Sequence, residues 1–206
     1  LILVGALGSL SVAAVSIFLQ PRLILLCFSR SLASAVTLVS CNYAGRGEKE
    51  PSADLLKKSL FLGALALGLL HGIFFIFLED ILLLMGASSD YLPLAMEYSP
   101  LALLAVYFTS LTLILQAVQL GYGNTASIMK TNICGNLLNA ALSFLLIRGL
   151  GPVPAYGVFG AAIGTAAGTL FSLLYAWFLL KREGFFHGGR WIPDTAYFKK
   201  VGPLFG

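Results

Sequence analysis

A long apolar helix with regularly spaced amides is encoded by residues 132–149, NICGNLLNAALSFLLIRG. At about 100° per residue, its four polar side chains fall within an arc of about 60° on a helical wheel. They are Asn132, Asn136, Asn139 and Ser143. Because an unpaired amide is costly in hydrocarbon, this polar stripe must face another polar surface or water.

The composition of the whole chain is that of an integral membrane protein. Its 206 residues are 58% hydrophobic and 11% charged, whereas a typical soluble domain has about 25% charged residues. The mean hydropathy is +0.90. So few polar groups cannot cover a surface that faces water. The three cysteines, Cys27, Cys41 and Cys134, lie in apolar runs without paired spacing, which predicts free, buried thiols.

Five apolar stretches are long enough to cross a bilayer as helices, which requires roughly 20 residues each. They are about 12–43, 59–79, 95–120, 132–149 and 157–180. The sequence therefore predicts an all-α polytopic membrane protein. The first stretch exceeds one bilayer thickness, so we expect it to protrude or to bend near Pro21. Residues 1–7 are typical of the tail of an earlier helix, and residues 198–206 of the start of a later one.

Basic residues alternate between the segments that connect these stretches. Segments 44–58, 121–131 and 181–200 hold four, one and five of the 13 Lys and Arg residues, and segments 79–94 and 150–156 hold none. Lys and Arg of short loops are retained on the cytoplasmic side of a cell membrane. The pattern therefore predicts that the three basic segments are cytoplasmic and that the first stretch runs from outside to inside.

Similar polar stripes occur on three other predicted spans. They comprise Arg30, Ser34, Thr37 and Cys41 on the first span, Thr109, Thr112, Gln116 and Gln119 on the third, and Thr165, Thr169 and Ser172 on the fifth. Two interpretations remain open. The stripes either form hydrogen bonds between helices, each contributing about 0.6–2 kcal/mol, or line a water-filled path for a solute.

We favour the solute path for the stripes taken together, because amides and an arginine exceed what helix packing requires. Arg30 lies deep in its span, and a central arginine costs about 2.5–3.5 kcal/mol on insertion scales, so such residues normally face a cavity. The candidate path residues are Arg30, Thr112, Gln116, Asn132 and Asn136.

A second pattern on the last predicted span favours close helix packing. Gly160, Gly164 and Gly168 recur at intervals of four within residues 156–169, YGVFGAAIGTAAGT. Small residues at this spacing let a neighbouring helix approach closely.

Several classes of function are excluded by missing motifs. The sequence has no glycine-rich phosphate loop, no HExxH or GxSxG motif, and no Cys/His metal cluster. The predicted spans contain almost no carboxylate, and no nucleophile and base can be paired. We therefore expect no enzyme, no cofactor or metal, and no nucleic-acid partner. A sodium or proton gradient is the energy source that remains.

Five segments of the chain resemble the multidrug and toxic compound extrusion (MATE) transporters. These are residues 3–15 (LVGALGSLSVAAV), 39–48 (VSCNYAGRGE), 85–101 (MGASSDYLPLAMEYSPL), 120–149 and 156–169. The resemblance implies twelve helices in two pseudosymmetric lobes of six. Residues 1–206 would then be the N-terminal lobe, from the end of helix one to the start of helix seven, without the C-terminal lobe.

The resemblance also implies an ion site in this lobe, built around helices one, five and six. Asn139 matches the family's helix-five asparagine, Ser143 stands where many members have an acid, and Thr165 matches the helix-six threonine. The helix-one acid would precede residue 1, because it lies four residues before the pair that matches Val4 and Gly5.

The resemblance predicts a cation-coupled antiporter that exports amphipathic organic compounds by alternating access. Its partners would be the lipid bilayer, small organic substrates and the missing C-terminal lobe. Two alternatives remain open: a lipid-linked saccharide flippase of the same superfamily, and a non-transporting membrane scaffold.

Overall fold

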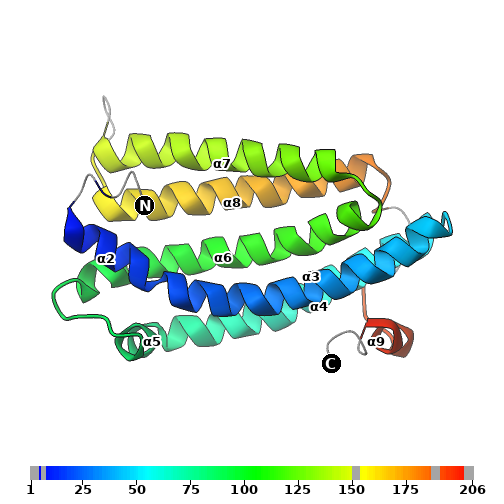
Figure 1. Ribbon diagram of the computed structural model, residues 1–206, viewed down its shortest axis with the longest axis horizontal. Helices are drawn as coiled ribbons and strands as arrows, with labels where there is room; N and C mark the ends of the chain where they lie inside the picture. Colours follow the sequence, from blue (N-terminus) through cyan, green and yellow to red (C-terminus); the bar gives the residue numbers. More distant parts are fainter. Residues whose placement is uncertain (1–4, 6–7, 150–153, 187–190, 202–206) are drawn as a thin grey trace. The chain divides into compact units, whose positions relative to one another are not determined.

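The computed structural model describes residues 5, 8–149, 154–186 and 191–201, and within these ranges every regular element is a helix (Figure 1). The predicted all-α class is therefore confirmed. The helix fragments predicted at residues 1–7 and 198–206 lie mostly outside these ranges. The helices are α2 (Ser9–Ile17), α3 (Leu19–Gly45), α4 (Lys49–Ile76), α5 (Leu78–Leu84), α6 (Leu92–Gly121), α7 (Thr125–Arg148), α8 (Gly157–Arg182) and α9 (Thr195–Val201).

The length and composition of these helices are those of a polytopic membrane protein. Within the described ranges, four stretches are long and apolar enough to cross a bilayer: Ser9–Gly45, Lys49–Ile76, Leu92–Gly121 and Gly157–Arg182. Helix α7, with 24 residues, is long enough as well, but its amides make it less apolar. On α4, the side chains of Leu65 and Leu69 are 66% and 69% exposed, as expected of a surface that contacts lipid.

The boundaries of the first two predicted spans need correction. Stretch 12–43 is two helices separated at Phe18, because Pro21 has no N–H to donate to the carbonyl of Ile17. The predicted bend near Pro21 is thus present. Helix α4 begins ten residues before the predicted span, because hydropathy marks only the apolar part of a helix. An ion pair between Asp54 and Lys58, four residues apart, stabilises the polar extension.

The chain forms two compact units. Unit 1 comprises Leu1–Leu25, Leu70–Phe108 and Cys134–Phe171, and unit 2 comprises Leu26–Leu69, Thr109–Ile133 and Ser172–Gly206. Unit 2 contains all three basic segments, and unit 1 contains both segments without a base. This division matches the predicted alternation of charge.

Hydrogen bonds within unit 2 join its three basic segments. The Tyr122 hydroxyl donates to the Glu48 carbonyl at 2.9 Å. The Asn124 amide and the Ser127 hydroxyl donate to Glu183 Oε1 at 2.6 and 3.1 Å. These contacts bring segments 44–58, 121–131 and 181–200 together at one end of unit 2.

Helices α7 and α8 pack against each other in unit 1 through the predicted glycine face (Figure 1). A Cβ atom added to Gly168 would lie 2.6 Å from Asn139 Cβ and 2.8 Å from the Gly135 carbonyl oxygen. A Cβ atom on Gly164 would lie 2.7 Å from the Ser143 backbone nitrogen. All three distances are too short for a real side chain, so only glycine permits this approach. The partner of the glycine face is the helix that carries the amides.

The three cysteines are free, but they are exposed on the chain and not buried as predicted. The prediction took an apolar sequence context as evidence of burial inside the protein. In a chain that crosses a membrane, an apolar run can face lipid instead. Cys27, Cys41 and Cys134 therefore need not be buried by other parts of the protein.

Candidate functional site

A cavity of ligand size lies within unit 2, among α3, α6 and α7. Its volume is about 610 Å³, which is within the usual range of small-molecule sites. The lining is Arg30, Ala33, Ser34, Thr37, Leu38, Leu113, Gln116, Ala117, Leu120, Thr125 and Ile128. We call this space the Arg30 cavity.

One side of the Arg30 cavity is the predicted polar stripe of α3. Arg30, Ser34 and Thr37 line it one turn apart, as three of the four stripe members. The Thr37 hydroxyl donates to the Ala33 carbonyl at 2.9 Å, so its oxygen is left to accept hydrogen bonds from the cavity. Helical periodicity therefore aligns an arginine and two hydroxyls along one wall.

Gln116 of α6 also lines the cavity, and it is hydrogen-bonded to Asn132 of α7, which is not among the lining residues. Gln116 Nε2 donates to Asn132 Oδ1 at 2.9 Å, which joins the predicted stripes of α6 and α7. This bond uses one of the donors of Gln116 and leaves the other donor and the carbonyl oxygen. Gln119 lies one turn further along α6, is fully buried and is not among the cavity residues. Thr112 is also buried and outside the cavity lining.

Some polar residues act as packing contacts between helices. Ser29 on α3 donates to Ser110 on α6 at 2.7 Å, and both side chains are fully buried. This contact is hydrogen-bonded helix packing just outside the stripes, and the Gln116–Asn132 bond is a contact of the same kind between two stripe residues. The solute path stays a prediction.

The residues matched to the family's ion site lie in unit 1. Ser143 is buried and donates to Asn139 Oδ1 at 3.0 Å, while Thr165 donates to the Ala161 carbonyl of its own helix at 2.8 Å. Asn136 is exposed on α7. The structure thus brings Asn139 and Ser143 together and directs the Thr165 hydroxyl to backbone. In the described ranges, no group of three or more His, Cys, Asp or Glu residues could hold a metal ion.

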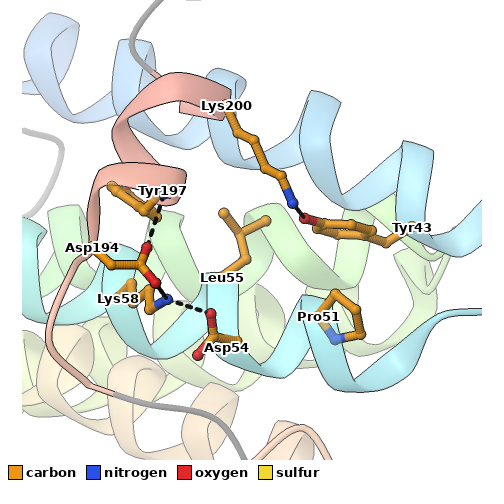
Figure 2. A pocket seen from close by; sticks show the side chains of 8 residues that line it. All are labelled: Tyr43, Pro51, Asp54, Leu55, Lys58, Asp194, Tyr197 and Lys200. Atoms are coloured by element: carbon orange, nitrogen blue, oxygen red, sulfur yellow. Dashed lines mark hydrogen bonds and ion pairs between the residues drawn. The ribbon is translucent and has the colours of Figure 1, made fainter.

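A second polar cluster in unit 2 joins α9 to α4 (Figure 2). Lys58 Nζ contacts Asp54 Oδ2 at 2.6 Å and Asp194 Oδ2 at 2.8 Å, and only 5% of the lysine side chain is exposed. The Asp194 carboxylate also accepts the Tyr197 backbone N–H at 2.9 Å. The hydrogen bond from Lys58 is the main reason why the pKa of Asp194 lies below its usual value. We call this group the Lys58 cluster.

Two further contacts hold α9 in place beside the Lys58 cluster. Tyr197 Oη and Ser59 Oγ are hydrogen-bonded at 3.0 Å in a buried position. Lys200 Nζ donates to Tyr43 Oη at 2.6 Å (Figure 2). Both side chains line a pocket of about 90 Å³. Helix α9 is therefore fixed to α3 and α4 through side chains far apart in sequence.

Helices long and apolar enough to cross a bilayer, packed around a ligand-sized and partly polar cavity, define a polytopic membrane protein. The sequence profile of the MatE family matches residues 1–145, and the chain belongs to this family. The predicted resemblance is confirmed. The family is one of transporters and not of enzymes.

Curated relatives and solved structures agree with this assignment. A probable multidrug resistance protein NorM of Rhizobium meliloti is 26% identical over 205 residues, which are 97% of this chain and 44% of that protein. A FAD transporter of Shewanella oneidensis is 26% identical over 177 residues, covering 86% of this chain and 39% of that protein. A crystal structure of MATE in the bent conformation has a TM-score of 0.87 at 23% identity, covering 99% of this chain and 46% of that one. The chain spans less than half the length of these relatives.

Proposed function

We propose that this chain forms one lobe of a cation-coupled exporter of amphipathic organic compounds. The observation that carries the proposal is the Arg30 cavity, in which polar residues from three helices meet an apolar wall. Such a mixture binds a molecule that has both a polar group and an apolar body. A cavity of about 610 Å³ has room for a drug-sized molecule.

In this proposal, a second lobe of similar size completes the transport path. The coverage of less than half of each relative supports a second lobe, since the matched relatives have that additional length. Transport would proceed by rocking of one lobe against the other around a bound solute. The basic end of unit 2 would face the cytoplasm of a cell membrane, as the distribution of Lys and Arg favours.

The coupling ion would be sodium or a proton. Asn139, Ser143 and Thr165 would border the ion site, with amide and hydroxyl oxygens as ligands for a hard cation. Ser143 cannot carry the charge of the acid that it replaces. Coupling would therefore depend on an acid outside this chain, on helix one or in the second lobe.

Replacing Gln116 with methionine tests the exporter proposal. Gln116→Met keeps the side-chain volume but removes an amide from the cavity and the donor to Asn132. We expect efflux of a fluorescent dye panel, cationic and anionic, from an efflux-deficient bacterium to fall about tenfold, which corresponds to about 1.4 kcal/mol. The variant is made in the complete polypeptide that carries this chain, and its amount in the membrane is measured in parallel.

Gln119→Met is the matched control, since Gln119 is on the same helix but outside the cavity. It should leave efflux unchanged. Equal efflux by both variants at equal expression would contradict the exporter site. A loss of efflux that only follows a loss of folded protein would favour the scaffold instead.

A further inference from the structure

Arg30 is the charged side chain of its cavity. Among the described residues that line the cavity, no other is ionisable and none is a carboxylate. In the part of the chain that the structure describes, Arg30 forms no ion pair. Arg30 is exposed on the chain, and the donors of its guanidinium are left for another partner.

The depth of Arg30 in the membrane makes its charge significant. Arg30 precedes the end of α3 at Gly45 by about 22 Å at 1.5 Å per residue. The candidate span Ser9–Gly45 has 37 residues, more than the roughly 20 that a hydrocarbon core of about 30 Å requires, and Arg30 lies near its middle, away from both ends. A charge at that depth is retained where it has a function or a partner.

The remaining lining of the cavity adds no negative charge. Ser34 and Gln116 supply neutral polar groups, and Leu38, Leu113 and Leu120 form an apolar wall. Thr125, the first residue of α7, also lines the cavity, so the positive end of that helix dipole adds weakly to the same field. The electrostatic field of this lining attracts an anion and repels a cation.

We propose that the Arg30 cavity binds the anionic group of an amphipathic organic solute, with Arg30 as its direct ligand. Carboxylate, sulfonate and phosphate groups all match the planar fork of donors that a guanidinium presents. The leucine wall contacts the apolar body of the solute. This inference rests on the proposed function for naming the solute as cargo, and it narrows that cargo to organic anions. The anion has two sources, a free solute or a lipid headgroup.

Binding of two aromatic probes of opposite charge tests the proposal. The complete polypeptide that carries this chain is purified into lipid nanodiscs, and binding of 1-pyrenesulfonate and 1-pyrenemethylammonium is measured by fluorescence against empty nanodiscs. We expect Arg30→Gln to weaken binding of the sulfonate at least tenfold and to leave the ammonium probe bound equally well or better. Arg30→Lys, which keeps the charge, should retain most of the sulfonate binding.

Arg22→Gln is the matched control, because Arg22 is also exposed on α3 but does not line the cavity. It should leave sulfonate binding unchanged. Nanodiscs with and without phosphatidylglycerol separate the two sources of anion. Competition by this lipid in an Arg30-dependent manner would assign the site to a headgroup, whereas binding unaffected by the lipid assigns it to a free solute.

The proposal is overturned if Arg30→Gln leaves sulfonate affinity unchanged, or if the unaltered chain prefers the ammonium probe. This failure is distinct from failure of the exporter function. The binding assay needs no transport, and the Gln116→Met efflux assay includes dyes of both charges. Loss of efflux in Gln116→Met together with unchanged sulfonate binding in Arg30→Gln would reject only the anion site.

Discussion

Replacing Gly168 with alanine should destabilise the chain by about 1–3 kcal/mol, the usual cost of overpacking a tight contact. The added methyl group would lie 2.6 Å from Asn139 Cβ and 2.8 Å from a backbone oxygen of α7, and backbone cannot move aside as a side chain can. The helices α7 and α8 would have to separate. The midpoint of thermal unfolding, followed by the fluorescence of Trp177 and Trp191 in nanodiscs, measures the effect.

The same change at Gly72 should have the opposite sign or no effect. Gly72 is in the interior of α4, and nothing lies within 4 Å of an added Cβ. Alanine has a higher helix propensity than glycine by about 1 kcal/mol, so Gly72→Ala should leave stability unchanged or raise it by up to that amount. If both variants stabilised the chain, the close packing of α7 on α8 would be wrong.

Replacing Lys58 with alanine should cost about 2–3 kcal/mol. Removing one partner of a fully buried ion pair costs about 3–5 kcal/mol, and the partial exposure of Asp54 and Asp194 reduces that figure. The two carboxylates would then repel each other without the cation between them. We expect α9 to detach, and hydrogen exchange of the backbone amides of Thr195–Val201 reports this directly.

Lys49→Ala is the matched control for the Lys58 cluster. Lys49 is the first residue of the same helix, is exposed and belongs to no described ion pair. Its replacement should leave both the unfolding midpoint and the exchange of α9 unchanged. Rapid exchange in the unaltered chain, or equal effects of the two variants, would show that the Lys58 cluster does not hold α9.

Periodicity in the sequence predicted the helical class and the two faces that matter most. The stripe on α3 and the amides of α6 and α7 were visible because residues three or four apart share a helix face. The glycine face of α8 was visible for the same reason. Its partner was not, because periodicity shows which face is buried but not which helix covers it.

Other features depended on distances that no local pattern encodes. Lys58 and Asp194 are 136 residues apart, so only the pair of Lys58 with Asp54 could have been inferred from spacing. Nothing in the local sequence marks Thr125 or the leucines of the Arg30 cavity as residues that line a cavity. The start of α4 was missed because charged residues extend the helix beyond its apolar part.

The central claim is that the polar stripe of α3 faces water inside the membrane. The most direct test compares the reaction of Ser34→Cys and Leu65→Cys with a charged, membrane-impermeant methanethiosulfonate in native membranes, after the three natural cysteines are replaced by alanine. Both positions are exposed on the chain, but Ser34 lines the Arg30 cavity and Leu65 lies on the apolar surface of α4. We predict that Ser34→Cys reacts at least tenfold faster than Leu65→Cys. Equally slow reaction at both positions would contradict the claim.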